Sequence, residues 1–167
     1  MKKLVLIICM FFACMGVSFA QQGIQSVGIH LSYGTEIENV GLGIKYQYNI
    51  TNSLRIEPSM EYFFKKDAVD MYDINMNLHY LIPIQNQVRI YPLAGLTYTN
   101  WNWDLGKTEI GGANLNVDAS KSKFGANFGG GIEFDIANNF MFNFEAKYQL
   151  ISDFDQAVFN FGIAYMF

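Results

Sequence analysis

The sequence is poor in cysteine, proline and charge. Its 167 residues include two cysteines and three prolines, and only 16% of them are charged. The 11 lysines and arginines stand against 15 aspartates and glutamates, for a net charge of −4. This balance argues against a nucleic-acid partner, because binding to phosphates needs a basic patch. With 51% hydrophobic residues, the composition also excludes a disordered chain.

Long hydrophobic runs are scarce too. Residues 4–15 form an apolar run that follows two lysines and precedes the small residues of Ser18-Phe19-Ala20. This pattern predicts that 1–20 is a cleaved signal peptide and that 21–167 is one domain. Both cysteines fall in the signal peptide, which leaves no disulfide and no thiolate site; the alternative is that Cys14 is a lipoprotein acylation site. No later run reaches the roughly 18 apolar residues of a membrane-spanning helix.

Apolar and polar residues instead alternate along much of the chain. From residue 27 onward, apolar and polar side chains alternate with a period of two, the pattern of β-strands with one apolar face. The runs have about the 9–11 residues that a tilted membrane-spanning strand requires. We therefore predict an all-β chain of eight strands, at 27–33, 40–50, 54–64, 72–82, 88–98, 123–136, 140–150 and 157–167.

Charged side chains within these segments all fall on the polar face. That face points to water in a soluble barrel and to the interior in a membrane barrel. The charged residues are Lys45, Arg55, Glu57, Glu61, Asp73, Arg89, Lys123, Glu133, Asp135, Glu145 and Lys147.

Three features favour the membrane barrel. The apolar face carries more large residues than the narrow interior of an eight-stranded barrel can hold. Strand glycines other than Gly130 lie on the polar face, where a crowded interior would need them. The connections 51–53, 83–86 and 137–139 are short and uncharged, as periplasmic turns are. The longer connections, expected outside the cell, hold all remaining charges after residue 20 and lie at 34–39, 65–70, 100–122 and 151–155. A soluble periplasmic ligand-binding barrel remains the alternative fold.

Four stretches resemble the small eight-stranded outer-membrane barrels, a superfamily that includes the OmpA transmembrane domain, OmpX and opacity-like proteins. They are VGLGIKYQY at 40–48, YPLAGLTY at 91–98, FGGGIEF at 128–134 and FNFGIAYMF at 159–167. The resemblance implies an antiparallel up-and-down transmembrane barrel in the outer membrane, with outer-membrane lipid and lipopolysaccharide as partners. It also implies that the outer-membrane assembly machinery recognises the last strand through Phe159, Phe161, Ile163, Tyr165 and Phe167.

Two prolines interrupt the pattern. Pro58 and Pro92 lie within predicted strands, where each removes a backbone donor from the sheet. We expect a bulge or the start of a strand at each.

The charges on the polar face nearly balance. Because isolated buried charges are costly, we expect them, together with His79, to form a self-neutralising polar plug. A narrow ion or small-solute pore is the alternative, since the same groups could line a path.

Catalysis has one weak candidate site. His30 has Ser32 two residues along on the same face, and Glu36 and Glu38 follow in the next connection. A Ser/His/Glu site that modifies lipid A is therefore an alternative. The spacing is unspecific, and we expect a non-enzymatic protein without cofactor or metal.

The longest connection, 100–122, contains Trp101, Trp103 and Leu105. Alternation resumes on both sides of it, which predicts that the flanking strands continue as a ribbon whose free edges could bind an extracellular partner. Alternatively, the tryptophans anchor the barrel at the lipid headgroups. We expect a structural or surface-interaction role, in membrane integrity or adhesion.

Overall fold

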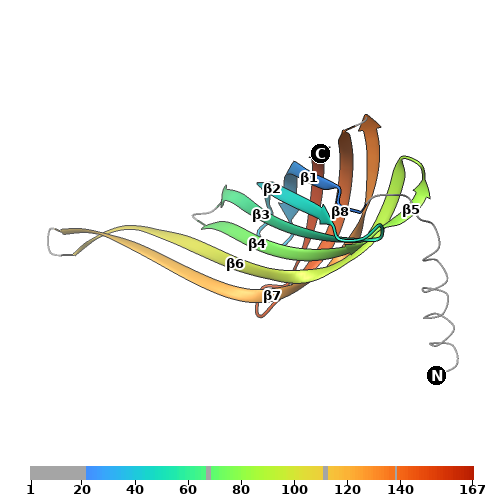
Figure 1. Cartoon of the computed structure of the whole chain (residues 1–167). Coiled ribbons are helices and arrows are strands. Elements are labelled where there is room, and N and C mark those ends of the chain that lie inside the picture. The colour runs from blue at the N-terminus through green and yellow to red at the C-terminus, as the bar shows by residue number, and fades with distance from the viewer. Residues whose placement is uncertain (1–21, 67–68, 111–112, 138) are drawn as a thin grey trace, which may run out of the picture.

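The structure, a computed structural model, is one antiparallel sheet that curves around on itself (Figure 1). It describes residues 22–66, 69–110, 113–137 and 139–167. The strands are β1 (Gln25–Gly34), β2 (Asn39–Asn49), β3 (Leu54–Lys66), β4 (Val69–Tyr80), β5 (Ile82–Gln85), β6 (Val88–Ile110), β7 (Ala113–Ala137), β8 (Phe140–Ile151) and β9 (Gln156–Met166).

The sheet closes into a barrel because both of its ends find partners. β1 pairs with β9 as well as with β2, and β4 pairs with β6 as well as with β3. β5 continues β4 in the same register along β6, with His79↔Leu93 before the break and Ile82↔Ile90 after it. β4 and β5 therefore form one interrupted strand, and the barrel has the predicted eight.

The prolines weaken the sheet without displacing it, so the expectation of a bulge or strand start at Pro58 and Pro92 is wrong. The β2–β3 ladder lacks the two pairs at Glu57 and Pro58 but keeps its register, and Pro58 still pairs with Met76 of β4. The break between β4 and β5 lies across from Pro92, which still pairs with Gly130 of β7. A missing N–H removes one bond on one side only.

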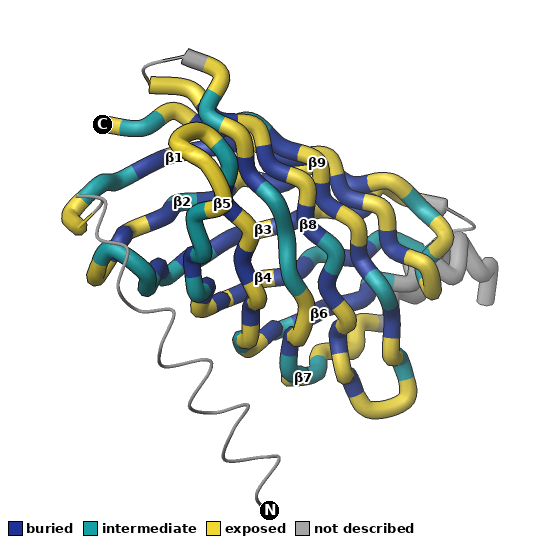
Figure 2. The backbone as a smooth tube through the Cα atoms, turned by 90° about the vertical axis from the view of Figure 1, so that its right-hand side faces the viewer, coloured by how far each residue is buried: buried dark blue, intermediate teal, exposed yellow. Residues whose placement is uncertain are grey.

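Alternation sends the apolar side chains outward and the polar ones inward, so that buried and exposed residues follow one another along each strand (Figure 2). Leu96 and Phe124, both on the outer face, are 68% and 79% exposed. An exposed apolar belt around a polar interior is the arrangement of a membrane barrel. Among the described residues, no helix has the length and apolarity needed to cross a membrane.

One glycine of the inner face makes room for a neighbouring ring. A Cβ added to Gly43 would lie 2.2 Å from Nε2 of His30, its partner across the β1–β2 pair. Glycine therefore lies on the inner face where a neighbouring side chain covers the backbone. This agrees with the expectation that a crowded interior needs glycine.

The longest strands, β6 and β7, extend beyond the barrel as a two-stranded ribbon (Figure 1). Pairing of β6 with β4 ends at Trp103, and pairing of β7 with β8 ends at Gly125. Beyond these points the two strands pair with each other as far as Ile110↔Ala113. Two ends of the barrel can thus be distinguished: the turn end, with the connections after β2, β5 and β7, and the loop end, with the ribbon.

Candidate functional site

Charged side chains of several strands point into the interior of the barrel, and those nearest the turn end form one cluster. Arg55 donates to both carboxylate oxygens of Glu133, from Nη1 at 2.6 Å and Nη2 at 3.0 Å. Arg89 also contacts Glu133 and donates from Nη1 to Asp135 Oδ2 at 2.8 Å. Arg55, Arg89 and Asp135 line a cavity of about 320 Å³ at the turn end. Two guanidinium groups and two carboxylates neutralise one another here.

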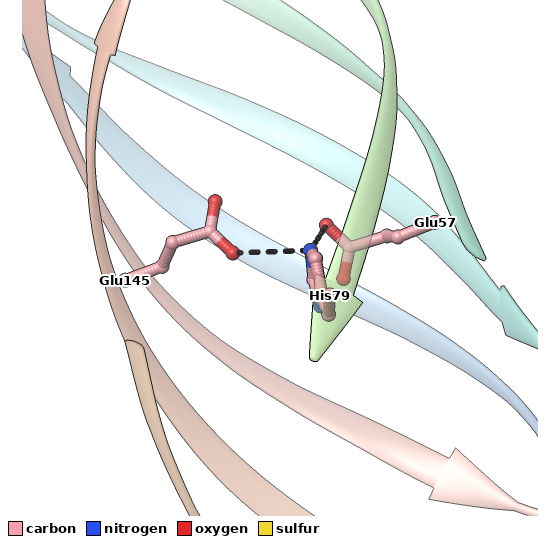
Figure 3. A group of neighbouring side chains, drawn as sticks. All are labelled: Glu57, His79 and Glu145. Atoms are coloured by element: carbon pink, nitrogen blue, oxygen red, sulfur yellow. Dashed lines mark ion pairs between the residues drawn. The ribbon is translucent and has the colours of Figure 1, made fainter. Parts of the chain in front are cut away.

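A second cluster lies one layer deeper. Lys45 Nζ is 3.6 Å from Glu57 Oε2. On the other side of Glu57, His79 Nε2 lies 3.7 Å from Glu57 Oε1 and 3.9 Å from Glu145 Oε2 (Figure 3). The Tyr91 ring stacks on His79 with centroids 4.5 Å apart, and its hydroxyl donates to Glu145 Oε2 at 3.1 Å. The cluster contains one lysine and two carboxylates, together with a histidine that connects them.

The third layer is built around Glu61. Its Oε1 accepts from Lys147 Nζ at 2.6 Å, and it lies 3.2 Å from His30 Nε2 and 3.3 Å from Asn160 Nδ2. Lys147 and Glu61 are fully buried. A buried pair of this kind is stable only when further polar groups satisfy it, which His30 and Asn160 do.

Toward the loop end, amide side chains make the hydrogen bonds of the interior. Asp73 accepts from Gln149 Nε2 at 3.0 Å. Asn127 donates to Asn75 at 2.8 Å and to Asn77 at 2.9 Å. Interior polarity therefore continues beyond the last lysine.

An apolar cap lies at the loop end of the interior, a feature that the alternation alone does not predict. Buried residues of five strands meet there: Phe63, Met71, Trp101, Ile151 and Val158, with Ile37, Val69 and Phe154 packed against them. All five strand residues lie at positions that alternation assigns to the inner face. Apolar residues at these otherwise polar positions are the sequence signal of the cap.

Trp101 is therefore neither a surface-interaction residue nor a headgroup anchor. Its side chain is 3% exposed, and its ring contacts that of Phe154 with centroids 4.7 Å apart. The reason is that β6 continues past the predicted strand end without changing face. The side chains of Trp103 and Leu105 lie outside the part of the chain whose side chains the structure describes.

Lys123 lies at the rim of the loop end, away from the interior network. Its ammonium is 2.5 Å from Oδ2 of Asp153 and also donates to the carbonyl of Ser152. The hydrogen bond and charge of Lys123 lower the pKa of the exposed Asp153 carboxyl. The remaining predicted members of the network, Asp135 included, lie inside the barrel.

We predict that Lys123→Met raises the pKa of Asp153 back toward its ordinary range, measured by NMR titration of that carboxyl. Because the folded-state pKa is the depressed one, the pair stabilises the fold above the unfolded pKa, and this contribution disappears as pH falls through the folded pKa. The effect on stability is small, because the pair is exposed. Lys121→Met is the control, since Lys121 is the weaker influence on Asp153. An unchanged pKa in Lys123→Met would contradict the assignment.

The alternative Ser/His/Glu catalytic set is not assembled as a relay. His30 faces Glu61 on β3, and the buried Ser32 Oγ has no hydrogen-bond partner among the described residues. Glu36 and Glu38 lie in the turn after β1. No hydrogen bond joins Ser32 to His30 in the described part of the chain.

The predicted assembly signal occupies β9 and the last residue. Phe159, Phe161, Tyr165 and Phe167 are exposed on the outer face, and Ile163 is half-buried on the same face. The strand pairs on both sides, with β1 and β8. Recognition of these residues by an assembly machinery remains a prediction.

Comparisons with known proteins agree with this architecture. A family model described as outer membrane protein beta-barrel domain matches residues 12–167. No curated protein matches the chain.

Several solved structures share the fold. Ail, the attachment invasion locus protein of Yersinia pestis, is 20% identical with a TM-score of 0.63, over 88% of this chain and 100% of that one. The N-terminal β-barrel domain of Pseudomonas aeruginosa OprF is 16% identical with a TM-score of 0.65, over 87% and 98%. Neisserial surface protein A is 16% identical with a TM-score of 0.65, over 86% and 96%.

Proposed function

Because the chain belongs to the outer membrane protein β-barrel domain family, we propose that it acts in the outer membrane as a plugged barrel with a structural and surface-interaction role. The observation that supports the proposal is how the interior is filled: linked polar side chains lie through the middle of the barrel, and the apolar cap lies at its loop end. An eight-stranded barrel has an interior that side chains alone can fill. A filled interior suits a scaffold better than a channel.

The plug is tested by conductance. We expect the chain, inserted into planar bilayers, to give no steady single-channel current. The physical reason is that ions would have to pass the Arg55–Glu133 pair, the Glu61–Lys147 pair and then the cap. Insertion is checked in parallel by protease protection in vesicles of the same lipid. Uniform current steps whose number rises with inserted protein would establish the narrow pore instead.

The ribbon of β6 and β7 supports the surface role. With the amino terminus in the periplasm, the turn end faces inward and the ribbon extends outside the cell, where its unpaired edges can add a partner's strand. Among the structural relatives, Ail is an attachment invasion locus protein and another is a surface protein. We assign the ribbon as the partner-binding element.

Shortening the ribbon tests this assignment. Residues 105–117 are replaced by Asn-Gly, a two-residue turn that closes the hairpin after the pair Asp104↔Asp118 and leaves every β4–β6 and β7–β8 pair in place. We expect cells displaying the intact chain to bind immobilised matrix proteins or cultured cells, and the shortened variant to lose most of that binding at equal surface abundance. Equal binding by both would exclude the ribbon.

A further inference from the structure

Three side chains from different strands converge in the middle layer of the barrel: Glu57 of β3, His79 of β4 and Glu145 of β8 (Figure 3). One ligand atom from each lies within 4.8 Å of the other two. We propose that this triad binds a divalent transition-metal ion of the zinc type inside the barrel. The site is independent of the surface role proposed above.

The distances suit a metal that bridges the three residues. Zinc binds imidazole nitrogen and carboxylate oxygen at about 2.0–2.2 Å, so two ligand atoms of a tetrahedral site lie about 3.4 Å apart. His79 Nε2 is 3.7 Å from Glu57 Oε1 and 3.9 Å from Glu145 Oε2. Both separations are too long for hydrogen bonds. A contraction of a few tenths of an ångström brings each carboxylate oxygen to this separation from His79 Nε2, and the two carboxylates, within 4.8 Å of each other, close on the same point.

His79 is the residue that points to a ligand. It is 0% exposed, and neither of its ring nitrogens has a hydrogen-bond partner among the described residues. Buried polar atoms are nearly always satisfied, so two orphan nitrogens on one ring require an explanation. The stacked Tyr91 ring, at an interplanar angle of 10°, holds the imidazole with Nε2 facing both carboxylates. A metal ion at that point supplies the missing partner.

The neighbouring amides hold the carboxylates in position. Gln47 donates to Glu57 Oε2 at 2.6 Å, leaving Oε1 toward His79. Asn160 donates to Glu145 Oε1 at 3.2 Å, leaving Oε2 toward His79. Tyr91 adds a hydrogen bond to that second oxygen. Outer-shell bonds of this kind orient the first ligands of metal sites.

Charge also favours a cation here. Among the described residues, Glu145 has no lysine or arginine nitrogen within 4.0 Å, and the basic side chain that approaches it is His79, with Nε2 at 3.9 Å. Across the described interior network, the cations are Lys45, Arg55, Arg89 and Lys147, and the carboxylates are Glu57, Glu61, Asp73, Glu133, Asp135 and Glu145. The cations pair with Glu57, Glu61, Glu133 and Asp135, which leaves Asp73 and Glu145 without a lysine or arginine partner. Glu145 belongs to the triad, and a bound cation there would compensate its charge.

The donor set selects the class of ion. One imidazole with two carboxylates is a ligand combination of zinc and other first-row divalent metals, whereas calcium and magnesium prefer oxygen alone. Access is restricted, because Arg55 pairs across the β3–β4 ladder with His79 and stands between the triad and the turn-end cavity. We therefore expect loading during folding and slow exchange afterwards.

Metal content after folding tests the proposal. The tag-free full chain is folded in detergent with Zn²⁺ or Co²⁺, freed of excess metal on a desalting column and analysed by mass spectrometry. We expect about one ion per chain, and a visible d–d absorption band for Co²⁺ that reports a nitrogen and oxygen ligand set. The variants His79→Asn and Glu145→Gln should retain less than about a tenth of the metal, since even outer-shell changes weaken metal sites 10–100-fold.

His30→Asn is the matched control, because His30 is equally buried and faces Glu61. It should retain metal like the unmodified chain. Heat-modifiable migration on gels confirms that each variant is folded. The Co²⁺ absorption band of the unmodified chain tests the proposal without relying on any variant. A metal-free unmodified chain, or equal retention by His79→Asn and His30→Asn, overturns the proposal.

Discussion

Replacing Glu133 with glutamine is expected to lower the free energy of unfolding by about 3–5 kcal/mol, because removal of one partner of a buried ion pair leaves the other charge uncompensated. Glu133 is 0% exposed and contacts both Arg55 and Arg89. The amide of glutamine keeps one acceptor oxygen, but it loses the negative charge and replaces the second acceptor with an NH₂ donor that faces guanidinium groups, which are donors only. The measurement is equilibrium unfolding by urea of the barrel in lipid vesicles, followed by tryptophan fluorescence.

Asp135→Asn is the matched control for Glu133→Gln. The Asp135 side chain is 22% exposed beside the turn-end cavity, so water solvates the Arg89 charge that the substitution releases. We expect a clearly smaller loss of stability, because partly exposed pairs contribute less. Equal unfolding midpoints for the unmodified chain and Glu133→Gln would mean that the cluster does not stabilise the barrel.

Closure, strand number and the direction of each face could be predicted from the sequence. A strand between lipid and a polar interior has a different environment on each side. The polarity of each residue therefore indicates which side its side chain faces. Lys45 and Glu61 are buried and Phe124 is exposed, as their parity predicts. Trp101 obeys the same rule. Its position has the parity of Arg89 and therefore faces inward, although its apolar ring favours an outer position.

Partners across the barrel could not be predicted in the same way. Arg55 and Glu133 are 78 residues apart, and they meet because strand tilt and stagger bring their positions to one level of the interior. Parity carries no information on stagger. For the same reason Glu57, His79 and Glu145 show no metal-binding spacing in the sequence, although they converge in space.

Truncating Trp101 to alanine is expected to lower the free energy of unfolding by about 3–5 kcal/mol, the usual range for removing a buried tryptophan side chain. The cap loses its largest side chain and the ring contact of that side chain with Phe154. The surrounding strands cannot move into the space, because their register is fixed by pairing on both sides. Urea unfolding in vesicles measures the loss. Trp101→Phe, which keeps an aromatic ring in the cap, should recover more than half of it.

Fluorescence distinguishes the buried cap from a lipid anchor at the same residue. The sequence has two tryptophans, so Trp103→Phe leaves Trp101 as the single reporter. A ring that is 3% exposed and points into the barrel should be shielded both from acrylamide in water and from brominated lipid tails in the bilayer. An anchor ring would instead be quenched by lipid, as residues of an aromatic girdle lie at the membrane interface. Strong quenching by brominated lipid would therefore contradict the cap, even if Trp101→Ala proved destabilising.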